Sequence, residues 1–365
     1  MRIQSVQLRN FRNIREASLQ TDKQFIVLYG PNGAGKTSIL ECIYMLASLR
    51  SFRDSSPLNL IQFGEVSTFV EANVRTLLGT QKMVWGCHSK KEGRFLQIDR
   101  KNIRDLDVWF QALRAILFCP ENIEIVRGSP QTRRNFLDRA RFVAQPTYLQ
   151  VVRRYLNVLH QKRELLKKDS VTDEELTPWN LQLIEYGTKI TLERQAILQE
   201  LEAPFQQMHQ YIAGTERVTL ALRGIASAEP EGVKERLQQL IEKVKIEERR
   251  RRQSLVGPHR DDLDILINDV PAKKFASQGQ TRSIVLALKL AELEASHKRG
   301  DTPLFLLDDL SSELDFERLK KLVQMLSERD GQVWITTTNP NFLGALPKSR
   351  VARFYVDQGN VKLER

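Results

Sequence analysis

The most constraining feature of the sequence is the segment Gly30–Thr37, Gly-Pro-Asn-Gly-Ala-Gly-Lys-Thr. It follows the apolar run Phe25–Tyr29 and precedes a predicted helix, Ser38–Leu46. This is the pattern G-x-x-x-x-G-K-[ST] in the strand–loop–helix setting that it requires. Its glycines let backbone N–H groups and the helix N-terminus face phosphate oxygens. We expect Lys36 to hold the β- and γ-phosphates of a nucleotide and Thr37 to ligate Mg²⁺. The loop residues expected around the phosphates are Gly30, Pro31, Asn32, Gly33, Ala34 and Gly35.

Two carboxylates follow a second apolar run. Leu304–Leu307 predicts a buried parallel strand, and Asp308 and Asp309 come directly after it. Because α/β sheets bind ligands at the carboxyl ends of their strands, we expect both aspartates close to the phosphate loop. Asp308 suits the Mg²⁺ shell, and Asp309 suits orienting or deprotonating an attacking water. Without the phosphate loop, the same pattern would describe a capped strand end.

The periodicity of apolar residues divides the chain into three parts. The first part carries short alternating runs typical of strands, and the last alternates strands and helices. Between them the spacing is helical, and residues 169–178 predict a loop joining two long antiparallel helices. We therefore expect an α/β domain built from both chain ends, residues 1–120 and 253–365, with an inserted helical lobe at 121–252. The elements predicted in the last part are Leu263–Ile267, Thr281–Lys298, Leu304–Leu307, Phe316–Glu328 and Val333–Thr337.

Basic residues are concentrated in the helical part. The formal net charge is +11, and residues 127–168 hold eleven Lys and Arg against two acidic residues. A second basic run, Arg249–Arg252, ends another helical pattern. Clustered cations attract a polyanion, so DNA is the expected partner, with a solvated helix face and an acidic protein surface as alternatives. The candidate DNA-binding residues are Arg133, Arg134, Arg153, Arg154, Lys162 and Arg163.

Several classes of protein are excluded by what the sequence lacks. No apolar run approaches the roughly 18 residues that a transmembrane helix needs, so no membrane partner is expected. The first eight residues alternate like a strand and do not resemble a signal peptide, which predicts a cytoplasmic location. Three isolated cysteines and five scattered histidines give neither a disulfide framework nor metal-ligand spacing.

Further motifs, taken with the phosphate loop, carry a family resemblance. The phosphate loop, Ser277–Gln280 (Ser-Gln-Gly-Gln), Leu306–Asp309 (Leu-Leu-Asp-Asp) and Ser312–Asp315 (Ser-Glu-Leu-Asp) occur in this order. Taken alone, the second and fourth segments are helix caps. In this order the four resemble the ABC-type ATPases of the SMC-like DNA-repair class, and most closely the RecF family. The resemblance extends over Leu8–Asn13, Arg50–Arg53, Phe118–Glu121, Gly128–Arg134, Phe136–Asp138 and Leu255–Asp262.

The resemblance implies an SMC-head-like P-loop ATPase domain with an inserted helical subdomain. It implies that Ser277, Gln278, Gly279 and Gln280 form a signature motif that contacts the γ-phosphate bound by a second subunit. ATP would then hold a homodimer together. Asp309 stands where transporter-type ATPases usually carry glutamate, which implies slow, DNA-stimulated hydrolysis.

Two positions depart from the pattern of the wider class. Thr336–Thr338 stands where many of these ATPases carry a switch histidine, and Glu121 lies near the usual Q-loop glutamine. A threonine hydroxyl is then the expected, weaker substitute for the γ-phosphate sensor.

For function, the resemblance implies an ATP-dependent DNA-binding clamp of recombinational repair. It would bind single-stranded or gapped DNA and junctions, and assist RecA loading with RecO and RecR. Two other functions fit parts of the sequence: a transporter-type nucleotide-binding subunit, and an ATP-binding interaction protein that does not hydrolyse ATP.

Overall fold

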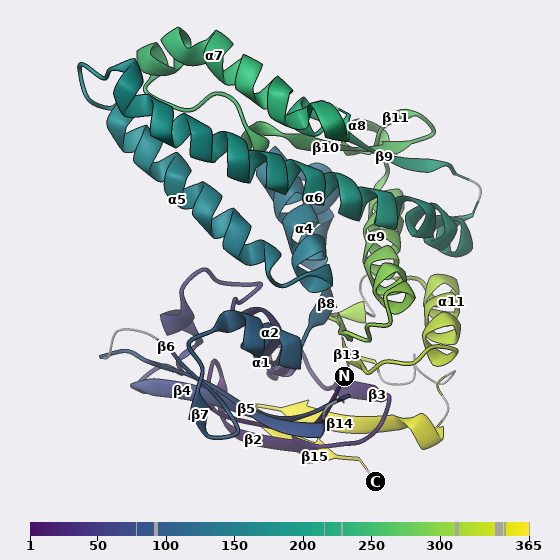
Figure 1. Ribbon diagram of the computed structural model, residues 1–365. Coiled ribbons are helices and arrows are strands. Elements are labelled where there is room, and N and C mark those ends of the chain that lie inside the picture. Colours follow the sequence, from purple (N-terminus) through teal and green to yellow (C-terminus); the bar gives the residue numbers. More distant parts are fainter. Residues whose placement is uncertain are drawn as a thin grey trace. The chain divides into compact units, whose positions relative to one another are not determined.

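The computed structural model describes residues 1–77, 79–90, 94–214, 216–227, 229–310, 314–339, 346 and 348–364. The chain divides into two compact units. The first comprises Met1–Asn122 and Glu292–Arg365, and the second Ile123–Ala291. Both ends of the chain therefore contribute to one unit (Figure 1).

A mostly parallel sheet forms one layer of the first unit. Its strand order is β15-β14-β3-β13-β12-β8, and only β15 runs antiparallel to its neighbour. The central strands are continuous apolar runs, as expected for strands covered on both faces. The expected strands at residues 25–29, 304–307 and 333–337 have the predicted bounds. The six strands are β3 (Phe25–Tyr29), β8 (Ala115–Phe118), β12 (Leu304–Leu307), β13 (Val333–Thr337), β14 (Val351–Asp357) and β15 (Asn360–Leu363).

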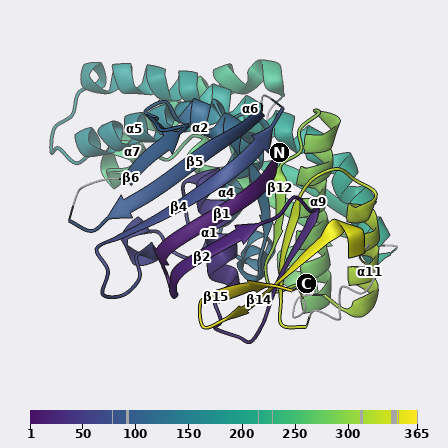
Figure 2. The same cartoon turned by 90° about the horizontal axis from the view of Figure 1, so that it is seen from below.

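An antiparallel sheet forms the other layer of the first unit. Its strands lie side by side in the order β2-β1-β4-β5-β6-β7 (Figure 2). Helix α1 (Lys36–Ser48), which follows the phosphate loop, contacts strands of both sheets and is buried almost all round. A helix that is apolar on every face needs such a position between two layers. The strands are β1 (Arg2–Phe11), β2 (Ile14–Gln20), β4 (Ser67–Thr76), β5 (Gly79–His88), β6 (Arg94–Ile98) and β7 (Lys101–Asn102).

Three helices run alongside one another in the second unit (Figure 1). They are α5 (Tyr148–Leu166), α6 (Asp173–Ala213) and α7 (Val233–Arg251). Tyr155 and Val158 of α5 lie in one apolar cluster with Leu183 and Ile190 of α6. The other α-helices among the described residues are α2 (Leu106–Ala112), α3 (Glu124–Arg127), α4 (Pro130–Ala144), α8 (Ala272–Phe275), α9 (Gln278–Lys298) and α11 (Phe316–Ser327), and one of the 3₁₀ turns lies at Pro120–Ile123.

The loop between the long helices is shorter than expected. Helix α6 begins at Asp173, inside the residues predicted as loop, and runs through Pro178. Thr172 and Glu175 form a capping box, each side chain accepting from the other residue's backbone N–H. A capping box and three acidic residues in the first turn stabilise the start of a helix. This stabilisation outweighs the cost of Pro178, which lacks a backbone N–H.

The boundary expected at residue 253 differs from the structure. Strand β10 (Asp262–Ile267) pairs with β9 (Val218–Arg223) and β11 (Val270–Pro271) in a separate three-stranded sheet. Strand β10 therefore belongs to the second unit, whose last residue lies within α9. The inserted part is therefore longer than residues 121–252. It is also not wholly helical, because the residues of β9 form a strand within the region that was predicted to be helical.

A buried ion pair joins α5 to α7. The Lys162 side chain is 0% exposed, and its Nζ donates to Glu248 Oε2 at 2.6 Å. Glu248 Oε1 also accepts from Ser254 Oγ at 3.1 Å and from Leu255 N at 2.8 Å. The two charges are thus paired with each other inside the protein, and Lys162 serves the packing of this unit.

Replacing Lys162 by methionine should lower the free energy of unfolding by about 3 kcal/mol, because Glu248 would keep a buried charge without a cation. Adding Glu248→Gln should recover more than half of that loss. Arg163→Met, an exposed neighbour on the same helix, should change stability by no more than about 0.5 kcal/mol. Urea unfolding of the parent and the three variants tests this, and a stable Lys162→Met variant would show that the pair is dispensable.

Candidate functional site

The phosphate loop connects β3 to α1 through three glycines with positive φ. Gly30, Gly33 and Gly35 have φ values of 148°, 76° and 112°. Gly30 is also required by space, since a Cβ there would lie 2.0 Å from the carbonyl oxygen of Val356. The loop therefore adopts a backbone that residues with a side chain seldom reach, and it leads directly into the N-terminus of α1.

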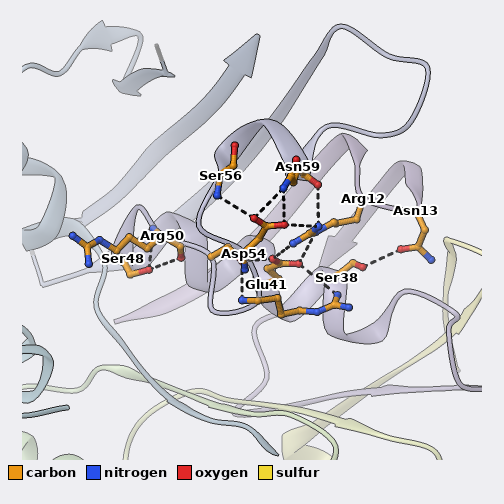
Figure 3. Close-up of polar contacts among 11 residues, drawn as sticks. Arg12, Asn13, Ser38, Glu41, Ser48, Arg50, Asp54, Ser56 and Asn59 are labelled. Carbon is orange, nitrogen blue, oxygen red and sulfur yellow. Dashed lines mark hydrogen bonds and ion pairs between the residues drawn. The ribbon is translucent and has the colours of Figure 1, made fainter. Parts of the chain in front are cut away.

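Two other turns hold this loop in place. The Asn13 side chain, between β1 and β2, donates from Nδ2 to Gly33 O at 3.1 Å. Its Oδ1 accepts from Ser38 Oγ at 2.9 Å (Figure 3). From the turn between β14 and β15, the Gly359 N–H donates to Ala34 O at 2.9 Å. The loop is thereby fixed from the N-terminal hairpin and from the C-terminal hairpin.

Lys36 lies folded back over its own loop. Its Nζ donates to Gly30 O at 2.8 Å and to Pro31 O at 2.7 Å. Burial lowers the pKa of Lys36, while the nearby Asp309 and Asp308 act in the opposite direction. An ammonium group held over the loop in this way is placed to bind a phosphate oxygen.

Asp308, at the carboxyl end of β12, connects the loop to the last strands of the sheet. Its Oδ1 accepts from Thr37 Oγ1 at 2.9 Å and from Thr336 Oγ1 at 2.6 Å. Its backbone N–H donates to Phe118 O at 2.9 Å, and the residue is 4% exposed. Thr37 and Asp308, which the sequence predicts as metal ligands, are thus in direct contact.

The electrostatics of this pair suit a divalent cation. Burial raises the pKa of Asp308, nearby Glu121 and Asp309 raise it further, and the hydroxyls of Thr336 and Thr37 lower it. A buried carboxylate that lacks a cation is costly, and Mg²⁺ prefers hard oxygen ligands from one or two carboxylates together with phosphates. The hydroxyl of Thr37 and the carboxylate of Asp308 fit that donor set.

Asp309 and Thr336 are coupled through the backbone. The Asp309 N–H donates to Thr336 Oγ1 at 2.8 Å, and Asp309 has a left-handed φ of 49°. Thr336 thus orients both the carboxylate of Asp308 and the turn that carries Asp309. The sequence analysis expects one hydroxyl of Thr336–Thr338 to act as a weak phosphate sensor without saying which, and in the structure Thr336 makes this positioning contact. Ser312 and Glu313 of the fourth motif lie outside the described residues.

The side chains that contact α1 at Glu41 were not predicted from the sequence. Glu41, whose side chain is 0% exposed, accepts from Arg12 Nη2 at 2.8 Å and Nε at 3.1 Å (Figure 3). Arg53 lies 3.7 Å from the same carboxylate, and Ser51 Oγ donates to it. Asp54 extends the network through Asn59. A glutamate in the middle of an apolar helix, as at position 41, was the available signal.

The Ser277–Gln280 motif lies at the start of α9 in the second unit. The Ser277 N–H donates to Gln280 Oε1 at 2.6 Å, and Gln280 N donates to Ser277 Oγ at 3.2 Å. Gln280 Nε2 also donates to Glu216 Oε1 at 2.5 Å. Ser277 and Gln278 are exposed, and Gly279 and Gln280 are partly buried. The motif is thus a well-formed helix cap with an accessible serine.

The predicted DNA-binding residues separate into internal and exposed groups. Besides Lys162, Arg133 is internal: its side chain is 7% exposed and donates through Nε to Asp262 at 2.7 Å. Arg134 is partly buried and donates from Nη1 to Asp261 O at 2.6 Å. The exposed cations of this group are Arg153, Arg154 and Arg163.

The second basic run is largely neutralised by ion pairs. Arg249 pairs with Asp173, Arg250 and Arg251 pair with Glu247, and Arg252 pairs with Asp169. Exposed cations remain on α5, at Arg153, Arg154 and Arg163, and on α7, at Lys234, Arg236 and Lys243. Among the helices that the structure describes, none is long and apolar enough to cross a bilayer.

Fold and site together define a P-loop ATPase of the SMC-like class. The family model "RecF/RecN/SMC N terminal domain" matches residues 2–362. A solved SMC head bound to the C-winged helix domain of ScpA has a similar fold, with a TM-score of 0.62 at 13% identity over 100% of this chain and 97% of that one.

The chain belongs to the RecF family. It is 35% identical to the "DNA replication and repair protein RecF" of Geotalea daltonii over 99% of this chain and 100% of the relative. A solved structure, described as "the recombination mediator protein RecF-ATP in RecFOR pathway", matches with a TM-score of 0.89 and 28% identity, over 100% of this chain and 97% of that chain. The resemblance inferred from the motifs is confirmed, and a transporter subunit is no longer a competing assignment.

Thr336→Val should weaken Mg²⁺-dependent nucleotide binding and shift its pH dependence upward. Losing a hydroxyl that donates to Asp308 raises the pKa of that carboxyl further, so more of it is protonated at a given acidic pH. Isothermal titration calorimetry with Mg²⁺-ATP, from about pH 5 to about pH 8, measures the shift. A carboxyl group of raised pKa titrates within roughly this range. Thr337→Val is the matched control, and an identical pH profile for both variants would contradict the assigned contact.

Proposed function

We propose that this protein is an ATP-dependent DNA-binding clamp of recombinational DNA repair. The observation that carries the proposal is the contact of Thr37, Asp308 and Thr336 beside the phosphate loop, in a chain of the RecF family. The proposed cofactors are ATP and Mg²⁺, and the proposed location is the cytoplasm. The relatives' name and the ATP-bound neighbour support this function for the chain.

In the proposed nucleotide complex, backbone N–H groups of Gly30–Thr37 face the phosphates, and Lys36 exchanges its loop carbonyls for phosphate oxygens. Thr37 and Asp308 are the proposed Mg²⁺ ligands, and the ion would neutralise charge on the β- and γ-phosphates. Asp309 is the proposed group that orients or deprotonates the attacking water. Its short side chain supports slow turnover, so that ATP acts mainly as a binding switch.

The proposed dimer places the Ser277–Gln280 motif of each subunit against the γ-phosphate held by the other. The exposed serine and the N-terminus of α9 supply a hydroxyl, N–H groups and a favourable dipole for an anion. Two ATP molecules would then close one homodimer. This arrangement explains why the chain carries a second anion-suited element that its own phosphate loop does not require.

The proposed DNA surface includes the exposed face of α5, with Arg153, Arg154 and Arg163. These side chains present charge without a base-reading motif, which favours phosphate contacts that depend on salt and little on sequence. The proposed substrates are single-stranded and gapped DNA and junctions. The proposed partners, RecO and RecR in loading RecA, rest on family membership alone.

A pair of variants tests the nucleotide switch. Lys36→Arg should reduce nucleotide binding or hydrolysis and abolish ATP-dependent DNA retention, because the phosphate contact is lost. Asp309→Asn should keep binding but slow hydrolysis, so that ATP-loaded protein stays on DNA longer than the parent does. Fluorescence anisotropy with a labelled gapped duplex, with and without ATP, measures both effects. If both variants bind DNA like the parent under either condition, the clamp is rejected, and an interaction protein that merely holds ATP becomes the better proposal.

The salt dependence of DNA binding tests the proposed surface. Replacing Arg153, Arg154 and Arg163 with glutamine should reduce the slope of log affinity against log salt by up to about 2.7, at roughly 0.9 per lost phosphate contact on duplex DNA. The matched control replaces three exposed cations of α7, Lys234, Arg236 and Lys243, with glutamine. Equal loss in both triple variants would show that α5 has no special part in binding.

A further inference from the structure

The segment Gly128–Arg134 contains a motif that the nucleotide site does not use. Gly128 is required by a close approach, since a Cβ there would lie 2.4 Å from the carbonyl oxygen of Glu124. Ser129 caps α4 by accepting from Thr132 N, and Pro130 occupies the first turn, where its missing N–H costs nothing. Arg133 is held by Asp262. These contacts account for the motif as a sharp connection between α3 and α4.

The residue just before this connection, Arg127, reaches the signature motif. Its Nη2 donates to the carbonyl oxygen of Ala276 at 2.8 Å and to Thr281 Oγ1 at 3.2 Å. Ala276 immediately precedes Ser277, and Thr281 Oγ1 in turn donates to Ser277 O at 2.7 Å. One guanidinium thus contacts the backbone just before the motif Ser277–Gln280 and the Thr281 side chain just after it.

A second cation makes the reverse contact. Lys273, on α8, donates from Nζ to the carbonyl oxygen of Gly128 at 2.8 Å. Arg127, next to Gly128, thus donates to the carbonyl oxygen of Ala276, and Lys273, shortly before Ser277, donates to the carbonyl oxygen of Gly128. Hydrogen bonds from charged donors are about twice as strong as neutral ones, so two reciprocal contacts set the relative position of the two turns.

The cap geometry decides which way the serine hydroxyl points. Ser277 Oγ accepts from Gln280 N, and a hydroxyl has two acceptor sites but only one proton. With an acceptor site occupied by its own helix, the hydroxyl keeps its proton for an outside acceptor. The carbonyl oxygen of Ser277 is likewise taken by Thr281. Any shift of Ala276 or Thr281 would change the direction of that proton.

We propose that Arg127 is a positioning residue that holds Ser277 in the conformation that binds the nucleotide of the second subunit. The proposal rests on the proposed ATP-dependent dimer and adds a residue to it. Arg127 touches no nucleotide in this role and acts through Ala276 and Thr281. Its loss should therefore weaken closing of the dimer while leaving nucleotide binding by the single subunit unchanged.

The test is a double-mutant cycle on the dimer. Arg127→Met should weaken dimer formation in the presence of Mg²⁺-ATPγS by about tenfold or more, the effect of losing a charged donor. In a Ser277→Ala background, the same change should cost less than about twofold, because the serine through which it acts is gone. Sedimentation equilibrium measures the four dimerisation constants, and nucleotide titration at low protein concentration measures the single-subunit affinity.

Three further proteins serve as controls. Arg127→Lys keeps the charge and one contact, so it should lie nearer the parent than Arg127→Met does. Lys273→Met removes the reverse contact and should weaken the dimer in the same direction, which keeps the test valid if Arg127→Met folds poorly. Arg236→Met removes an exposed arginine from α7 and should match the parent.

Two results would overturn the inference. One is parental dimerisation of both Arg127→Met and Lys273→Met. The other is an equal loss from Arg127→Met in the parent and in the Ser277→Ala background. Failure of the unmodified protein to dimerise with the nucleotide would instead reject the proposed function. The two failures are therefore distinguishable.

Discussion

The nucleotide site depends on one buried carboxylate. Asp308 directly follows strand β12, and two hydroxyls from different parts of the chain converge on its Oδ1. The phosphate loop contacts Asp308 through Thr37, and β13 contacts it through Thr336. Thr336 also accepts from the N–H of Asp309, which lies in the turn after β12. Because burial disfavours the charged form of Asp308, a cation bound there would relieve a cost that the protein already carries. The same contact thus organises the edge of the sheet and favours binding of a metal–nucleotide complex.

Charge in the second unit is used mainly for internal structure. Lys162 and Arg133 direct their charge to buried or nearly buried carboxylates, and the run Arg249–Arg252 is paired with acidic neighbours. Such pairs contribute little net stability compared with apolar packing, but they are costly to break from one side. The unit therefore presents a smaller basic surface than its composition suggests, and exposed cations remain on both α5 and α7. Arg127 follows the same logic by directing its charge to the backbone beside Ser277.

Much of the first unit was predictable because its signals are local. The spacing within Gly30–Thr37 and the apolar run before Asp308 each determine a strand end, and parallel strands bring those ends together. What the sequence could not supply were contacts between distant residues. A count of cations cannot distinguish Lys162, paired with Glu248, from exposed Arg163. The boundary expected at residue 253 differs from the structure for the same reason, because the pairing of β10 with β9 joins residues that are distant in the sequence. The early start of α6 was different, because Thr172 and Glu175 carried a local signal that Pro178 obscured.

The central claim, that ATP closes two copies of this chain into a DNA-holding dimer, is tested most directly by sedimentation velocity of the unmodified protein. The runs would be made with and without Mg²⁺-ATP, each repeated with a short gapped duplex. We expect ATP to shift the protein from monomer to dimer, and DNA to move in the same boundary as the dimer. A monomer that responds to neither ATP nor DNA would contradict it.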